Sequence, residues 1–272
     1  MSTPIIRILA FSALLLSATL PAYAAETDEA ARQARWTELK QSVFHGKEVA
    51  DSAGQVAIEA VDRATDAAMV PVTITLAEPL RKSVRALYFI IDDNPAPVAA
   101  VFHFGPAAEP GSVSTRVRIE DYTYMHAVAE LADGKLLGGT RFIKAAGGCA
   151  APAASDQEAS MKRLGKMKLA FQGAAQPGTP VTAQLLIAHP NNSGMQMNQV
   201  TRNYIPADFI QTISVAYAGE KVVTIDSGIA ISEDPSFRFT FLPKAAGALH
   251  AEFDDSNKRH FAQDWPLPPV TQ

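Results

Sequence analysis

Residues 70–76 read VPVTITL and residues 113–119 read VSTRVRI. In both stretches apolar and polar side chains alternate with a period of two, which is typical of a strand that buries one face. Further strand-like runs lie at residues 84–91, 98–104, 122–131 and 136–144. Because Pro-Gly, Asp-Gly and Asn-Pro turn sequences separate these runs, the first half of the chain is predicted to be an antiparallel β-sandwich.

The same period returns in the second half of the chain, after a stretch of small and polar residues. Strand-like runs lie at residues 167–171, 181–187, 210–217, 221–225, 237–241 and 248–253. They predict a second, smaller sandwich. One helix is predicted at residues 27–45, since Trp36, Leu39, Val43 and Phe44 are spaced to share one face and to pack against a sheet. The predicted fold class is all-β, with two antiparallel β-sandwich domains and a short N-terminal helix.

The beginning of the sequence has the pattern of a cleaved secretory signal peptide, predicted for residues 1–24. Arg7 precedes an apolar run at 8–20, and Ala22-Tyr23-Ala24 forms an A-x-A cleavage site. The apolar run has about 13 residues, whereas a membrane-spanning helix needs roughly 20, and no other stretch approaches that length. A lipid anchor would need a cysteine directly after the cleavage site. We therefore expect an exported protein without a membrane anchor.

Composition and charge exclude several function classes. The chain has 24 Lys and Arg against 28 Asp and Glu, a net charge of −4, and no dense basic run, so nucleic acid is not expected as a partner. The six histidines show no H-x-H or i, i+4 spacing, and no zinc site is predicted.

Cys149 is the single cysteine of the sequence, and it lies in residues 145–165, AAGGCAAPAASDQEASMKRLG. This stretch has few large apolar residues and is predicted to be a flexible linker. Gly147 and Gly148 precede the cysteine, so we expect an exposed arm that reaches roughly 17 Å from the sandwich. A solvated thiol has a pKa near 8.5, and the linker sequence supplies no base to activate it. These properties favour a covalent carrier over a catalytic nucleophile.

With these features the chain resembles the SoxY and SoxZ carrier pair of bacterial sulfur oxidation, fused into one polypeptide. Matching residues in the first half are Trp36, Leu39, VPVTI (70–74), VAELADG (128–134) and GGC (147–149). Matching residues in the second half are IAHP (187–190), YIPADFI (204–210), SEDP (232–235) and FRF (237–239). The closest subgroup is the SoxYZ-like carriers associated with quinoprotein dehydrogenases.

The resemblance implies immunoglobulin-like sandwiches, a periplasmic location and a sulfur-containing intermediate, such as a thiosulfate-derived one, bound covalently to Cys149. It implies partner oxidoreductases of the periplasm, no cofactor other than the sulfur adduct, and no catalytic site. The expected domains are a SoxY-like domain at 25–144, the linker at 145–165, a SoxZ-like domain at 166–264 and a tail at 265–272. One departure is that Ala150-Ala151-Pro152 replaces the glycines that follow the cysteine in the family, and another is that the arm is internal.

Three other readings of the residues remain open. His189 with Met195 and Met197 forms a set of soft ligands that would suit Cu(I) in a copper-handling protein. A non-covalent adaptor of a periplasmic dehydrogenase would not need Cys149 at all. A cysteine hydrolase would need a base beside the thiol, which the linker sequence does not supply.

Overall fold

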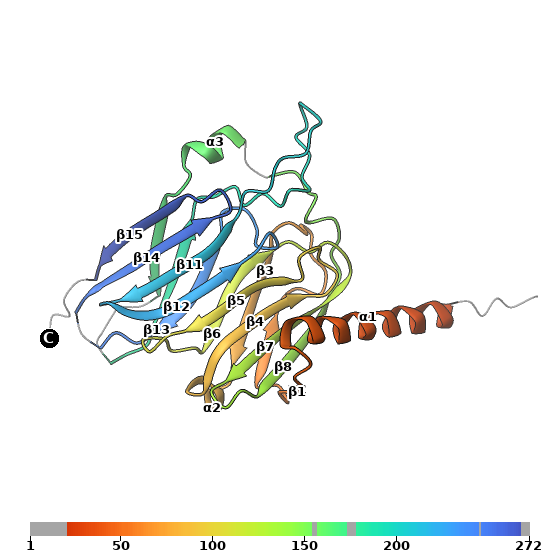
Figure 1. Ribbon diagram of the computed structural model, residues 1–272, viewed down its shortest axis with the longest axis horizontal. Helices are drawn as coiled ribbons and strands as arrows, with labels where there is room; N and C mark the ends of the chain where they lie inside the picture. The colour runs from red at the N-terminus through yellow and green to blue at the C-terminus, as the bar shows by residue number, and fades with distance from the viewer. Residues whose placement is uncertain (1–20, 154–156, 173–177, 245, 268–272) are drawn as a thin grey trace, which may run out of the picture.

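A computed structural model describes residues 21–153, 157–172, 178–244 and 246–267, with side chains from residue 29 onward. Two β-sheets pack face to face, and both run through the two halves of the chain (Figure 1). One sheet has nine strands in the order β1-β8-β7-β4-β5-β12-β11-β14-β15, and the other has six in the order β2-β3-β6-β13-β10-β9. The predicted signal peptide at 1–24 lies largely outside the described residues, and residues 268–272 of the predicted tail lie outside them as well.

The first half contributes eight strands to the two sheets. They are β1 (Val49–Asp51), β2 (Val56–Glu59), β3 (Val70–Leu76), β4 (Val84–Ile91), β5 (Val98–Phe104), β6 (Ser112–Val117), β7 (Thr123–Leu131) and β8 (Leu136–Ile143). The second half contributes β9 (Met167–Gln172), β10 (Val181–Ile187), β11 (Ile210–Tyr217), β12 (Glu220–Ser227), β13 (Ser236–Phe241), β14 (Ala248–Asp255) and β15 (His260–Pro266). The prediction of an all-β fold with an N-terminal helix is confirmed.

The two halves are joined edge to edge in both layers, along what we call the seam. Strand β5 pairs antiparallel with β12, with Val101 opposite Asp226, and β6 pairs with β13, with Ser114 opposite Arg238. A free edge strand exposes a row of unpaired N–H and C=O groups, and the seam satisfies them. One hydrophobic core therefore runs through both halves, from Val56 in β2 to Phe253 in β14.

The alternation of apolar and polar residues in strands such as β3 accounts for how each sheet buries one face. In β3 the side chains of Val70, Val72, Ile74 and Leu76 are buried, while those between them are more exposed. Strand β4 departs from this pattern, and most of its side chains are buried on both faces. The reason is that α1 covers its outer face.

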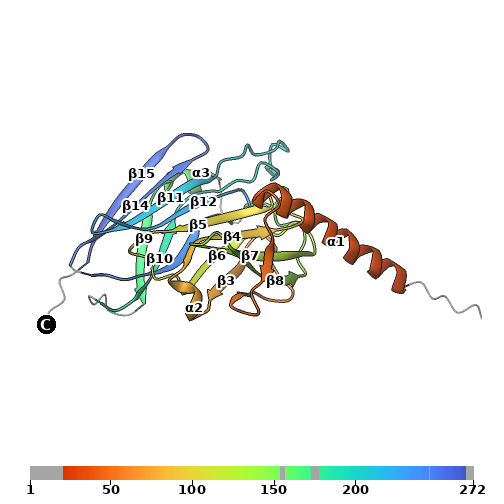
Figure 2. The ribbon, with the colours of Figure 1, turned by 60° about the horizontal axis from the view of Figure 1, so that its bottom comes forward.

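Helix α1 (Pro21–Phe44) packs its C-terminal half on the nine-stranded sheet, while its N-terminal end projects away from the sandwich (Figures 1 and 2). The face predicted from spacing is confirmed, because Trp36, Leu39, Val43 and Phe44 form a second apolar cluster with the sheet. The Trp36 ring stacks on His126 with a centroid separation of 3.7 Å. That imidazole is fixed from both sides, by Asp92 Oδ2 at 3.0 Å and Thr140 Oγ1 at 2.9 Å.

Several short or exposed elements escaped the sequence prediction. Strands β1, β2 and β15 and helices α2 (Glu78–Arg81) and α3 (Gln157–Lys162) were not predicted. Helix α3 lies inside the segment predicted to be a linker, and β15 extends the second half to Pro266. Within the described residues, no helix combines the length and apolar character required to cross a membrane.

Candidate functional site

The segment that carries Cys149 is folded against the body of the protein. After β8 the chain forms a turn at residues 148–150, and the Cys149 side chain is buried, with 1% of its surface exposed. The expectation of an extended, exposed arm is therefore wrong for this structure. The physical reason is that Gly147 and Gly148, from which the sequence predicts flexibility, instead allow the turn to approach neighbouring backbone closely.

Gly147 and Gly148 are both placed by specific backbone requirements. Gly147 has a φ of +77°, in the left-handed region that favours glycine, and its N–H donates to the Glu120 carbonyl at 2.8 Å. The Gly148 N–H donates to the Ile119 carbonyl at 2.9 Å. A Cβ atom on Gly148 would lie 2.1 Å from the Ala67 carbonyl oxygen, a separation that no side chain tolerates. These glycines allow the turn to pack closely against the backbone of Ala67, Ile119 and Glu120, so that the turn is held in place.

Groups from both halves of the chain close over Cys149. Its backbone N–H donates to Glu120 Oε2 at 2.9 Å, and its carbonyl accepts a hydrogen bond from Ser193 Oγ at 2.5 Å. Burial raises the pKa of the thiol to about 12, and the nearby Glu120 carboxylate adds to this rise, while Arg118 opposes it. At neutral pH only about one thiol in 10⁵ would be ionised in this state, so the closed turn holds an unreactive sulfur. We call residues 147–149 with these contacts the latch.

Arg118 lies behind the latch as a buried cation, with 2% of its surface exposed. Its guanidinium donates to the carbonyls of Ile229 and Ile231 in the second half, and its Nε has no hydrogen-bond partner among the described residues. Burial lowers the pKa of Arg118, against the raising influence of Cys149 and Glu233. A positive charge that interacts with the thiol is thus anchored across the seam.

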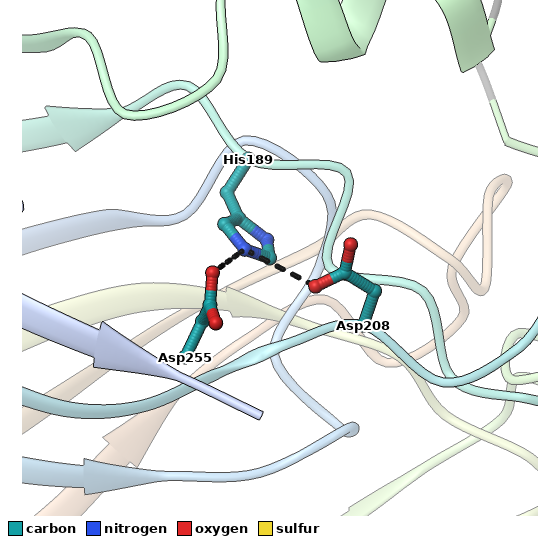
Figure 3. Close-up of side chains that lie close together, drawn as sticks. All are labelled: His189, Asp208 and Asp255. Carbon is teal, nitrogen blue, oxygen red and sulfur yellow. Dashed lines mark hydrogen bonds and ion pairs between the residues drawn. The ribbon is translucent and has the colours of Figure 1, made fainter. Parts of the chain in front are cut away.

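A second polar cluster lies in the second half, where His189 faces two carboxylates (Figure 3). His189 Nε2 is 3.5 Å from Asp255 Oδ2 and 3.6 Å from Asp208 Oδ1, and the three groups are close enough together to surround a metal ion. Arg259 already binds both carboxylates: its Nε donates to Asp255 Oδ2 at 2.6 Å and its Nη2 to Asp208. The arginine supplies the positive charge that a cation would otherwise bring.

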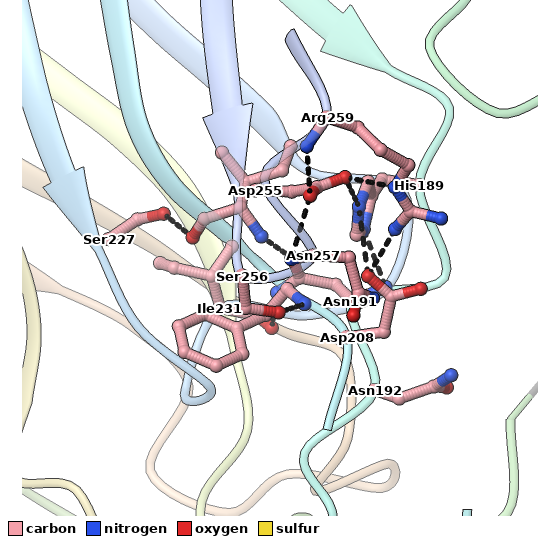
Figure 4. A network of polar contacts seen from close by, with 12 residues as sticks. His189, Asn191, Asn192, Asp208, Ser227, Ile231, Asp255, Ser256, Asn257 and Arg259 are labelled. Atoms are coloured by element: carbon pink, nitrogen blue, oxygen red, sulfur yellow. Dashed lines mark hydrogen bonds and ion pairs between the residues drawn. The ribbon is translucent and has the colours of Figure 1, made fainter. Parts of the chain in front are cut away.

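The hydrogen bonds around His189 fix its tautomer (Figure 4). The Asn191 N–H donates to Nδ1 at 3.0 Å, so Nδ1 is an acceptor and the ring hydrogen of the neutral imidazole is on Nε2, toward the aspartates. Burial lowers the pKa of His189, although Asp208 and Asp255 oppose this. Asn191 itself bonds to Ile231 and Ile210, which ties the cluster to the core. This network is a structural support.

The same network argues against the copper alternative. Both ring nitrogens of His189 are engaged within the buried cluster, whereas Met197 lies on a protruding loop with 40% of its surface exposed. A shared Cu(I) site of His189, Met195 and Met197 would have to break the Asn191 or aspartate contacts first. The structure does not favour that site.

The residues that surround Cys149 were missed at the level of sequence. Glu120, Arg118 and Ser193 lie between 29 and 44 positions away along the chain, and they show no motif that would assign them to the cysteine. The His189 cluster was missed for the same reason, since its aspartates come from other strands and loops. No local sequence pattern distinguishes the residues of either cluster from ordinary surface residues.

Comparisons with known proteins match the two halves of the chain to two families. The family model for sulfur oxidation protein SoxY matches residues 40–149, and the model for sulphur oxidation protein SoxZ matches residues 167–266. A solved structure of the sulfur carrier protein SoxY from Chlorobium limicola f thiosulfatophilum is 22% identical, covers 44% of this chain and 99% of its own, and has a TM-score of 0.38. No curated protein matches the chain. Because a SoxY domain is followed by a SoxZ domain in a single polypeptide, the chain belongs to the fused SoxYZ-like proteins of sulfur oxidation, a family of carrier proteins.

Proposed function

We propose that the protein is a periplasmic carrier that binds a sulfur-containing intermediate covalently on Cys149 and presents it to partner oxidoreductases. The observation that carries the proposal is that the SoxY match ends at Cys149, and that this is the single cysteine of the chain. The signal-peptide pattern at the beginning of the sequence supports the periplasmic location. The proposal needs no bound cofactor and no catalytic residue within the chain.

Burial of Cys149 adds a step to this function, because a thiol with a pKa of about 12 reacts slowly with any electrophile. The latch has to open before the sulfur is loaded. Once in water the thiol regains a pKa near 8.5, and a few per cent of it is ionised at pH 7. The carrier cycle is therefore proposed to alternate between a closed latch and an open arm within the reach of a partner.

The loading step requires an electron acceptor. With thiosulfate as the cargo, the Cys149 sulfur and the terminal sulfur of thiosulfate form one S–S bond, and the thiol S–H bond is broken. The reaction releases one proton and two electrons, which the loading partner takes up. A redox protein is thus the class of partner that the chemistry demands, in agreement with the family's link to sulfur-oxidation enzymes.

Mass spectrometry of the protein isolated from cells that oxidise sulfur compounds tests the proposal. The expected result is an adduct on the peptide that contains Cys149, absent from the Cys149→Ser variant. The Met161→Leu variant is a matched control, because Met161 is exposed on α3 in the neighbouring segment and should leave the adduct unchanged. A thiol that stays bare during active sulfur oxidation would contradict the proposal.

The burial of the thiol favours one alternative, a non-covalent adaptor that docks on a periplasmic quinoprotein dehydrogenase without using Cys149. An unreactive cysteine in a buried turn is what such a protein would have. The two functions separate in cells that carry Cys149→Ser. Full activity of the dependent pathway would support the adaptor, whereas loss of activity with unchanged protein abundance would support the carrier.

A further inference from the structure

The outer face of the six-stranded sheet carries a groove that the carrier chemistry does not use. Two adjoining hollows of 550 and 260 Å³ share Arg116 and Leu186 in their linings. The groove crosses five neighbouring strands, β3 and β6 of the first half and β13, β10 and the start of β9 of the second half. It therefore spans the seam.

Positive charge is concentrated in this groove. Its cationic side chains are Arg116, Arg163, Lys166, Lys168 and Arg238, and its acidic ones are Glu233 and Asp234. The groove thus carries +3 while the whole chain carries −4, so the rest of the chain carries −7. Such segregation creates a local potential that attracts acidic partners and repels the remainder of a like chain.

The internal partners of these cations leave much of the charge uncompensated. Arg163 pairs with Asp234 Oδ1 at 2.5 Å, and Arg116 donates to the Asp234 carbonyl at 2.7 Å. Lys166 and Lys168 are exposed and form no ion pair with any other described residue. Leu186 adds an exposed apolar side chain between the cations. The groove combines two available ammonium groups with an apolar contact.

The groove also adjoins the latch. Glu233 lines it and interacts electrostatically with Arg118, the cation that also interacts with Cys149. Met69 lines it too, two residues after Ala67, whose carbonyl lies against Gly148. A protein bound in the groove would therefore be next to the segment that must open.

We infer that this cationic groove is the docking site for an acidic surface segment of a partner oxidoreductase. The inference rests on the proposed carrier function and names the chemistry of the partner. The extent of the groove over five strands and the presence of Leu186 favour a polypeptide over a small oxyanion, which would contact only one or two of the five cations. Docking there steers the partner toward the latch and does not touch the sulfur itself.

The experiment measures fluorescence anisotropy of a labelled acidic octapeptide, Glu-Asp-Glu-Leu-Glu-Asp-Glu-Leu, with the full protein. We expect saturable binding that weakens at least tenfold between 50 and 500 mM NaCl, roughly as screening of a surface with several charges predicts. The double variant Lys166→Glu/Lys168→Glu should weaken binding at least tenfold. The control Lys47→Glu/Lys82→Glu makes the same change in net charge at exposed lysines outside the groove and should change binding less than twofold.

Three outcomes would overturn the inference. They are absence of peptide binding, equal weakening by both double variants, and strong binding of inorganic sulfate with displacement of the peptide at equimolar sulfate, which would make the groove an oxyanion site. A separate assay keeps the carrier function distinguishable. Tetrathionate transfers a thiosulfonate group to a thiolate and releases thiosulfate, so Cys149 should gain this adduct equally in both double variants. Failure of that loading in every variant would count against the carrier and not against the groove.

Discussion

The latch around Cys149 makes a quantitative prediction about thiol reactivity. Four hydrogen bonds hold residues 147–149, donated by the N–H groups of Gly147, Gly148 and Cys149 and by Ser193 Oγ. At roughly 1 kcal/mol each, opening the latch costs about 4 kcal/mol, equivalent to about 1,000-fold in the population of the open state. Since the closed thiol is unreactive, the wild-type protein should react about 1,000-fold more slowly than an unfolded chain at the same pH.

Gly148→Ala should weaken the latch selectively. The new methyl group would meet the Ala67 carbonyl oxygen at 2.1 Å and the Ile119 carbonyl oxygen at 2.7 Å. Overpacking of this kind costs about 2 kcal/mol, which should raise the reaction rate roughly 30-fold. The assay follows the absorbance of pyridinethione released from dithiodipyridine, with near-ultraviolet circular dichroism as the check that the variant is folded.

The matched control is Gly134→Ala in the turn between β7 and β8. Gly134 has a φ of +82°, and a Cβ there meets nothing within 4 Å. This variant adds the same methyl group at a glycine outside the latch, so its thiol rate should stay at the wild-type value. The reasoning is refuted if wild-type Cys149 reacts as fast as an unfolded thiol, or if folded Gly148→Ala reacts no faster than Gly134→Ala.

Three further outcomes are expected. Ser193→Ala removes one hydrogen bond from the latch and should raise the Cys149 reaction rate about fivefold; an unchanged rate would exclude this serine from the latch. Arg259→Ala leaves two buried aspartates without their cation and should lower the free energy of unfolding by about 3 kcal/mol in denaturant titrations; a loss below 1 kcal/mol would show that the network is not a support. The lowered pKa of His189 keeps it neutral when folded, so the unfolding free energy should fall as pH drops from 7 to 5, and His189→Gln should flatten that slope; an equal slope in the variant would contradict the assignment.

Much of the fold follows from local sequence, because period-two alternation reports directly on which face of a strand is buried. The bounds of β3, β4, β5, β10 and β11 agree with the predicted runs. Strand β15 was missed since its side chains are mostly exposed and its sequence, HFAQDWP, lacks alternation. It is placed by pairing with β14, a contact that local periodicity does not report. The seam is likewise invisible in the sequence, which predicts two separate sandwiches.

Much less of the candidate site than of the fold could be predicted from the sequence. The sequence singles out Cys149 as the proposed attachment site because it is the single cysteine, but the environment of Cys149 could not be predicted from the sequence. From the sequence alone, the small residues beside Cys149 predict a flexible arm. In the folded protein, the same small size allows Gly148 to lie between the carbonyls of Ala67 and Ile119. Burial of the thiol depends on Glu120 and Ser193, whose positions are fixed only by the tertiary fold.

The seam has a consequence for how the carrier persists at low abundance. Two separate polypeptides joined through paired edge strands would dissociate on dilution, because association then depends on concentration. Here the segment between β8 and β9 ties the two halves together, and a short tether of this kind gives an effective concentration on the order of millimolar. The halves therefore stay paired in a cell that makes few copies, and each copy keeps a latch whose contacts come from both halves of the same chain.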